Sequence, residues 1–224
     1  MSKATYKILK DEYIPVSVSV NGFETPVWIQ QLTPEGKYQS PLRYSGCGHS
    51  CNAMALSLRG KPTTPQQEIE FCVKRWGEPS VSSSGKKQYW FLSITGMVEI
   101  LNACGLNAKC YGVSEQTPKT ATEHIVSALN EGKLVTIVSS PSESFKENPF
   151  STGDHYVLLL GFTSDGKILV ANSSLNGVYD KCVGVQEVDS ETIMRALNPA
   201  GSPKQKTWGE LENLFEGIGY VIID

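Results

Sequence analysis

Long apolar runs, an excess of basic residues and phosphate-binding glycine motifs are all missing from this chain of 224 residues. No apolar stretch approaches the ~18–20 residues that cross a membrane, and residues 1–12 contain no apolar core of the kind found in signal peptides. The net charge of −3 leaves no broad basic surface for nucleic acid. We therefore expect a cytoplasmic protein with neither a membrane nor a nucleic-acid partner, and the oligomeric state stays open.

Histidine is scarce, with three residues, and none of the six cysteines belongs to a Cys-x-x-Cys pair. Most of these thiols are expected to be reduced and to pack in the core. A metal site could be drawn from Cys47, His49, Cys51 and His155. Their Cys-x-His-x-Cys spacing is not a common zinc pattern, so we expect no bound metal.

What the chain does have is an ordinary globular composition, with 40% hydrophobic and 19% charged residues. Its length fits one substantial domain. Apolar periodicity and turn residues predict a hairpin, then helices, then strands. The hairpin is expected at 13–20 and 26–30 around Asn21-Gly22, the helices at 49–58, 64–76, 93–104 and 120–130, and the strands at 133–138, 155–160, 167–171, 182–188 and 218–223. Helices early and strands late indicate an α+β fold with segregated layers.

Cys47 stands between Gly46 and Gly48, directly before a helical pattern. A thiol at a helix N-terminus meets unpaired backbone N–H groups and the positive end of the helix dipole, and both favour the thiolate. A lone cysteine is more often an inert core thiol. The flanking glycines argue for the reactive alternative here, because they let a substrate approach the backbone closely. Cys51, one turn later, is expected to pack beneath the site.

His155 and Asn172 supply the two other groups that such a thiol needs. His155 begins a predicted strand, where its imidazole could act as general base and acid. Asn172 ends the returning strand of the same hairpin, whose turn lies near Asp165-Gly166. Its side-chain oxygen could then hold the imidazole in orientation. Asp154 is the rival for that role, but neighbours on a strand point to opposite faces, so we prefer Asn172.

Acyl transfer also needs donors that stabilise an oxyanion. The backbone N–H of Cys47 can supply one. A side-chain amide from Gln30 or Gln31, just before the loop that leads to Cys47, could supply a second, and the residues alone leave that choice open.

Taken together, these motifs resemble those of the papain-like cysteine peptidases, and most of all the bacteriocin-processing-peptidase-like group related to the leader-cleaving domains of bacterial peptide exporters. That group has a Gly-Cys-Gly-Pro-Thr/Ser motif opening a helix, a His-containing strand ending in Gly, an Asp-Gly turn before Asp or Asn, and an upstream Pro-x-x-x-Gln. The matching segments here are Gly46-Cys47-Gly48-His49-Ser50, residues 153–161, Asp165-Gly166 with Asn172, and residues 26–30.

The resemblance covers about residues 26–175. It implies a single papain-like domain over 1–224, with a β extension at 1–25, a catalytic core at 26–175, and further strands and a helix at 176–224. It implies a helical part that carries the nucleophile and packs on an antiparallel sheet. It also favours Gln30 over Gln31 and implies no cofactor. Two departures are His49 in place of Pro and Asn172-Ser173 where Asp-Pro is common.

The function so implied is cleavage of peptide or amide bonds in a peptide or protein substrate through a Cys47 acyl-enzyme. The alternatives are acyl transfer by the same three residues, or an inactive domain that binds peptides. The sequence does not name the substrate. Residues 78–87 and 139–153, including Phe145 and Phe150, are expected to border the cleft because loops beside core elements commonly do so.

Overall fold

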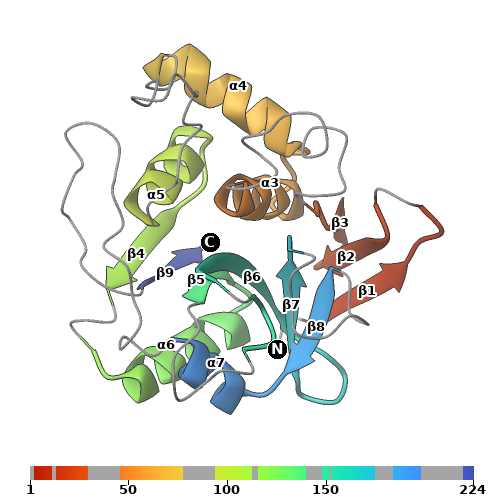
Figure 1. Ribbon diagram of the computed structural model, residues 1–224, viewed down its shortest axis with the longest axis vertical. Coiled ribbons are helices and arrows are strands. Elements are labelled where there is room, and N and C mark those ends of the chain that lie inside the picture. Colours follow the sequence, from red (N-terminus) through yellow and green to blue (C-terminus); the bar gives the residue numbers. More distant parts are fainter. Residues whose placement is uncertain are drawn as a thin grey trace.

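The computed structural model describes residues 3–11, 14–29, 46–77, 94–112, 116–139, 148–151, 153–174, 184–197 and 219–224. Within these ranges the chain forms two antiparallel sheets and five helices (Figure 1). The α+β class predicted from the sequence is confirmed. Among the described helices, none is long and apolar enough to cross a membrane.

The larger sheet has six strands, and the strand from the end of the chain lies in its interior. In spatial order the strands are β4 (Ala108–Gly112), β9 (Gly219–Ile223), β5 (Leu134–Ser139), β6 (His155–Phe162), β7 (Ile168–Asn172) and β8 (Val185–Val188). Every neighbouring pair is antiparallel. All residues of β5, β7 and β9 are buried, which requires cover on both faces of the sheet.

Three helices cover one face: α3 (Cys47–Leu58), α4 (Pro65–Trp76) and α5 (Ile94–Ala103). Helix α3 lies between α4 and the sheet, packed on β6, and all its residues from Gly48 onward are buried. The predicted start of α4 is confirmed, because the Thr64 side chain accepts from the Gln67 backbone N–H and Gln67 bonds back to the Thr64 N–H. This packing holds α3 against β6, the strand that begins at His155.

The opposite face is covered by α6 (Pro118–Asn130) and α7 (Ser190–Ala196). The sequence predicted that the first of these helices would begin at residue 120 or 121. It begins at Pro118, because the Thr117 side chain accepts from the Thr120 backbone N–H and Pro118 takes the first helical position.

A separate sheet of three strands precedes the helices: β1 (Ala4–Ile8), β2 (Val16–Val20) and β3 (Phe23–Pro26). The predicted turn at Asn21-Gly22 is confirmed, with φ of 52° and 86°. The expected return strand at 26–30 is wrong. A two-residue turn pairs Val20 with Phe23, so the return strand begins at once and ends at Pro26. The sequence analysis also missed β1 and β4.

Candidate active site

Cys47 is the first residue of α3. The helix cap, Gly46, gives no side-chain hydrogen bond, and its carbonyl accepts from the backbone N–H of Ser50 at 2.9 Å. The N–H groups of the first turn have no partner within the helix, so they remain available to another acceptor. Cys47 is half-buried, whereas Cys51 is fully buried in the core beneath it.

The thiol of Cys47 lies against the beginning of β6. Burial raises the pKa of the thiol, while the backbone N–H groups of Tyr156, Gly48 and Cys47 itself act toward the sulfur and lower that pKa. The charge of Asp154 raises the pKa further. Because Tyr156 directly follows His155, these contacts place the sulfur at the strand end that carries His155.

His155 is the first residue of β6 and is 4% exposed. Its Nε2 lies 2.8 Å from Oδ1 of Asn172, the last residue of β7. Burial lowers the pKa of His155 to about 4, against the smaller opposing effect of the Asn172 hydrogen bond. The imidazole is therefore neutral at neutral pH. With Nε2 donating to Asn172, Nδ1 is the nitrogen that can take a proton.

The two strands bring these residues together through a β-bulge. Val157 pairs with Asn172, and the register shifts between Leu159 and Gly161. His155 and Val157 lie on the same face of the strand, two residues apart, so Asn172 is the diagonal cross-strand neighbour of His155.

Both polar atoms of the Asn172 side-chain amide have further hydrogen-bond partners. Its Nδ2 donates to the carbonyl of Phe150 at 2.9 Å and to Oε1 of Gln186 at 3.1 Å. Its Oδ1 also accepts from the backbone N–H of Ser174 at 2.9 Å. Sequence reasoning missed Gln186, because one glutamine on a short strand carries no signal of its own.

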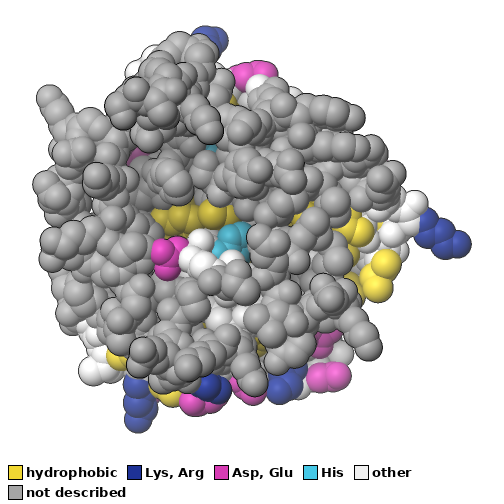
Figure 2. Space-filling model, in the orientation of Figure 1, with side chains coloured by type: hydrophobic (Ala, Val, Ile, Leu, Met, Phe, Trp, Pro, Cys, Tyr) yellow, Lys and Arg dark blue, Asp and Glu magenta, His cyan; other side chains and the backbone are white. Residues whose placement is uncertain are grey.

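Figure 2 shows the surface over this region. Hydrophobic side chains, a histidine and an acidic side chain gather near the middle of the face, over the part of Figure 1 where α3 meets the sheet. The two glutamines proposed as oxyanion donors, Gln30 and Gln31, lie outside the described residues, as does Phe145. Phe150 was expected at the border of the cleft. That expectation is wrong for its side chain, which is fully buried in the core.

His49, the unusual neighbour of the thiol, belongs to a buried polar cluster behind the site. Its Nδ1 bonds to Oε2 of Glu68 on α4, and Oε1 of Glu68 accepts from Nδ2 of Asn52 at 2.9 Å. All three residues are at most 1% exposed. Sequence reasoning missed Glu68, since a glutamate in the first turn of a helix is ordinarily a solvated residue.

The metal site considered from the sequence would draw on Cys47, His49, Cys51 and His155. Among the described residues, no group of three or more His, Cys, Asp or Glu side chains could hold a metal ion. His49 hydrogen-bonds to Glu68, and His155 hydrogen-bonds to Asn172.

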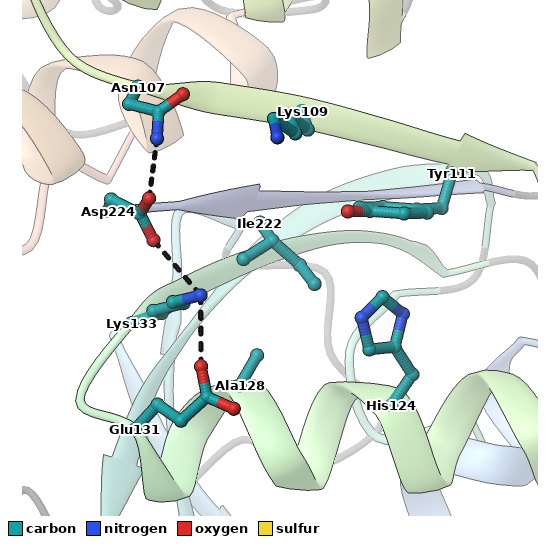
Figure 3. A pocket seen from close by; sticks show the side chains of 9 residues that line it. All are labelled: Asn107, Lys109, Tyr111, His124, Ala128, Glu131, Lys133, Ile222 and Asp224. Carbon is teal, nitrogen blue, oxygen red and sulfur yellow. Dashed lines mark hydrogen bonds and ion pairs between the residues drawn. The ribbon is translucent and has the colours of Figure 1, made fainter.

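A hollow elsewhere in the molecule lies between α6 and the β4–β9 edge of the sheet (Figure 3). The rings of Tyr111 and His124 meet edge to face, with centroids 4.8 Å apart. At the other end, Lys133 lies between the carboxylates of Glu131 and Asp224, at 2.9 Å and 3.3 Å. The lining includes none of Cys47, His155 or Asn172.

Comparison with known proteins identifies the family of this chain. No curated protein matches the chain. Among protein families, the Peptidase_C39 like family matches residues 26–212, which is most of the chain and includes α3, β6 and β7. The chain therefore belongs to the Peptidase_C39 like family, a family of papain-like cysteine peptidases.

Proposed function

We propose that the protein hydrolyses peptide or amide bonds through an acyl-enzyme on Cys47, with His155 as general base and acid and Asn172 as the residue that orients His155. The observation that carries this proposal is the His155–Asn172 hydrogen bond at the strand end against which the Cys47 thiol lies. These contacts support the proposal, because a cysteine peptidase needs a thiol, an imidazole and a group that orients the imidazole.

The reaction begins when Nδ1 of His155 takes the proton of the Cys47 thiol. The thiolate attacks the carbonyl carbon of the scissile bond, and a carbon–sulfur bond forms. The imidazolium then gives its proton to the leaving amine as the carbon–nitrogen bond breaks. Water attacks the resulting thioester, passes one proton to His155, and releases the acid; the same proton then returns to the Cys47 sulfur.

Oxyanion stabilisation in this proposal comes first from the start of α3. The backbone N–H groups of the first turn are unpaired within the helix, and they already act toward the Cys47 sulfur. Gln30 is our proposal for a second donor, as the family resemblance implies.

Electrostatics at the site favour an uncharged resting pair. Burial raises the pKa of Cys47 and lowers that of His155 to about 4, so thiol and imidazole are both neutral before substrate binds. Proton transfer then accompanies attack on the substrate, as in sites where a base activates the nucleophile.

The test combines thiol alkylation with a peptide-library screen. Iodoacetamide at neutral pH is expected to modify Cys47 before the other cysteines, because three backbone N–H groups act toward its sulfur and, in this proposal, His155 takes its proton. His155→Ala is expected to slow this labelling. In the screen, His155→Ala is expected to lower turnover by about 100-fold or more, the size of a general-base contribution.

Cys47→Ala is the control in both measurements. It is expected to remove the fast-labelling site and all cleavage. Cleavage that survives Cys47→Ala, or equal slow labelling of every cysteine, contradicts the proposal. Peptide binding without cleavage by the unmodified protein indicates a binding domain instead. Products joined to an added amine indicate acyl transfer.

A further inference from the structure

The Asn172 amide stands out because each of its polar atoms is used twice. Nδ2 donates to the carbonyl of Phe150 and to Oε1 of Gln186. Oδ1 accepts from Nε2 of His155 and from the backbone N–H of Ser174. An amide has two hydrogens to give and two lone pairs on its oxygen, so this amide is fully satisfied.

Two backbone groups act together with Gln186 to favour this orientation of the amide. The Phe150 carbonyl can only accept, and the Ser174 N–H can only donate. A reversed amide would place its NH₂ against the Ser174 N–H and its oxygen against the Phe150 carbonyl. Such a reversal leaves buried polar groups unpaired, at a cost of about 1–3 kcal/mol for each group.

The orientation of the Gln186 amide is likewise set by a backbone group. Its Nε2 donates to the carbonyl of Pro149 at 2.7 Å, which turns its Oε1 toward Asn172. The side chain is 8% exposed, on β8 beside β7. A backbone carbonyl at Pro149 therefore fixes Gln186, which fixes Asn172, which in turn requires a hydrogen on Nε2 of His155.

The segment that offers these carbonyls is itself anchored. Asn148 is fully buried; its Nδ2 donates to Oγ of Ser139 at 2.7 Å, and its Oδ1 accepts from the Phe150 N–H at 3.0 Å. Ser139 is the β5 residue that pairs with His155. The frame that orients the amides is thus tied to the strand beside the imidazole.

We propose that Gln186 is a positioning residue: through Asn172 it keeps His155 in the Nε2–H form, with Nδ1 free to take the Cys47 proton. Gln186 does not itself touch the thiol or the imidazole in this role. The catalytic part of this inference rests on the proposed function. The tautomer of His155 that Gln186 stabilises can be measured without any substrate.

The test is the ¹⁵N spectrum of the histidine rings in the full chain, which has only three histidines to resolve. Loss of one signal set in His155→Ala assigns His155. The unmodified protein is expected to show the Nε2–H tautomer. Gln186→Leu removes one acceptor of the Asn172 amide and is expected to mix the tautomers. It is also expected to slow Cys47 alkylation by about 10–100-fold, by analogy with the loss of outer-shell partners that orient metal-bound histidines.

The matched control is Glu187→Leu, which changes the next residue of β8, whose side chain is exposed. It is expected to leave both the tautomer and the alkylation rate within twofold of the unmodified protein. A single Nε2–H tautomer and an unchanged alkylation rate in Gln186→Leu would overturn the inference.

Gln186→Glu gives a second, independent readout, which remains usable if Gln186→Leu does not fold. When protonated, the introduced carboxyl can still accept from Asn172 and donate to Pro149, but when ionised it cannot donate. Its alkylation rate relative to the unmodified protein is expected to fall as pH rises through the pKa of that carboxyl. A ratio independent of pH overturns the inference.

Failure of the proposed function is distinguishable from failure of this inference. If the unmodified protein cleaves no peptide and Cys47 is not selectively labelled, the proposed function fails. The tautomer of His155 in Gln186→Leu and Glu187→Leu still decides whether Gln186 orients the imidazole.

Discussion

At the scale of single residues, His155 shows how burial prepares a base. The ring is nearly inaccessible to solvent, and burial lowers its pKa from 6.5 to about 4. Because its pKa is low, the ring takes up few protons from solvent near neutral pH. It therefore stays in the uncharged form that can accept a proton from a thiol.

The same shift predicts a pH-dependent stability. The unfolded chain binds a proton at His155 near pH 6.5, whereas the folded chain does so only near pH 4, so unfolding takes up a proton between these values. The free energy of unfolding is therefore expected to fall by about 3 kcal/mol from this residue as pH drops through that window. Urea unfolding of the unmodified protein and His155→Gln at several pH values measures the difference. Parallel curves for the two proteins contradict it, because the two proteins differ only at residue 155.

The sequence revealed the residues whose neighbours along the chain carry a pattern. Cys47 has flanking glycines and a following helix, and His155 and Asn172 end the two strands of a recognisable hairpin. The roles of Glu68 and Gln186 were not predicted, because each residue hydrogen-bonds to a partner at least 14 positions away. No pattern in the neighbouring sequence indicates that either side chain is buried. The start of α4 near residue 64 was predictable for the opposite reason, since the capping of this helix by Thr64 is a local interaction.

At the scale of elements, the bulge in β6 decides whether the site exists. Phe162 pairs with Ile168 and Gly161 with Leu169, and regular pairing continued from there would place Asn172 opposite Leu158. Opposite residues share a face, so Asn172 would then lie on the face away from His155. One extra residue in β6 moves Asn172 opposite Val157 and onto the face of His155. Strand periodicity could not predict this, because every residue from 155 to 160 is buried.

Gly161 permits the bulge, with a φ of 139° that other residues rarely adopt. Gly161→Ala is expected to cost about 1–3 kcal/mol in the free energy of unfolding. It is also expected to slow Cys47 alkylation, because a strand without the bulge turns Asn172 away from His155. Gly153→Ala is the control, since an added Cβ there meets no atom within 4 Å. Chemical unfolding and alkylation rates of the two variants check this, and equal behaviour of the two contradicts it.

At the scale of the whole molecule, the larger sheet is completed by the end of the chain. Strand β9 lies between β4 and β5, so it pairs with residues more than 80 positions earlier. The sequence analysis placed a strand at 218–223 and an antiparallel sheet near the C-terminus, but strand order depends on contacts that periodicity does not contain. The Peptidase_C39 like match over 26–212 stops before this strand.

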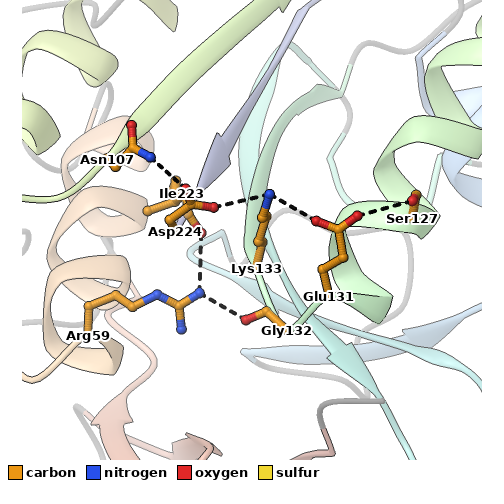
Figure 4. A network of polar contacts seen from close by, with 8 residues as sticks. All are labelled: Arg59, Asn107, Ser127, Glu131, Gly132, Lys133, Ile223 and Asp224. Atoms are coloured by element: carbon orange, nitrogen blue, oxygen red, sulfur yellow. Dashed lines mark hydrogen bonds and ion pairs between the residues drawn. The ribbon is translucent and has the colours of Figure 1, made fainter.

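Two basic side chains, Arg59 and Lys133, make polar contacts with the end of β9 (Figure 4). Arg59, just after α3, donates from Nη2 to the carbonyls of Gly132 at 3.0 Å and Ile223 at 3.2 Å. Lys133 forms ion pairs with Glu131 and Asp224, and all three side chains are at least 34% exposed. The guanidinium therefore joins α3, the turn before β5 and the end of β9, whereas the lysine bridges partners in solvent.

This difference predicts unequal stabilities. Arg59→Met keeps the aliphatic stem and leaves two carbonyls without their donor, so it is expected to lower the free energy of unfolding by about 1–3 kcal/mol. Lys133→Met is the matched control and is expected to cost less than about 1 kcal/mol, because exposed ion pairs are weak and are screened by salt. Urea unfolding at low and high salt, with hydrogen exchange of the β9 amides, measures both. Strand β9 lies inside the sheet, so weakening the contacts at its end is expected to make its amides exchange faster in Arg59→Met. A larger loss of unfolding free energy in Lys133→Met than in Arg59→Met would show that the exposed ion pairs hold the strand instead.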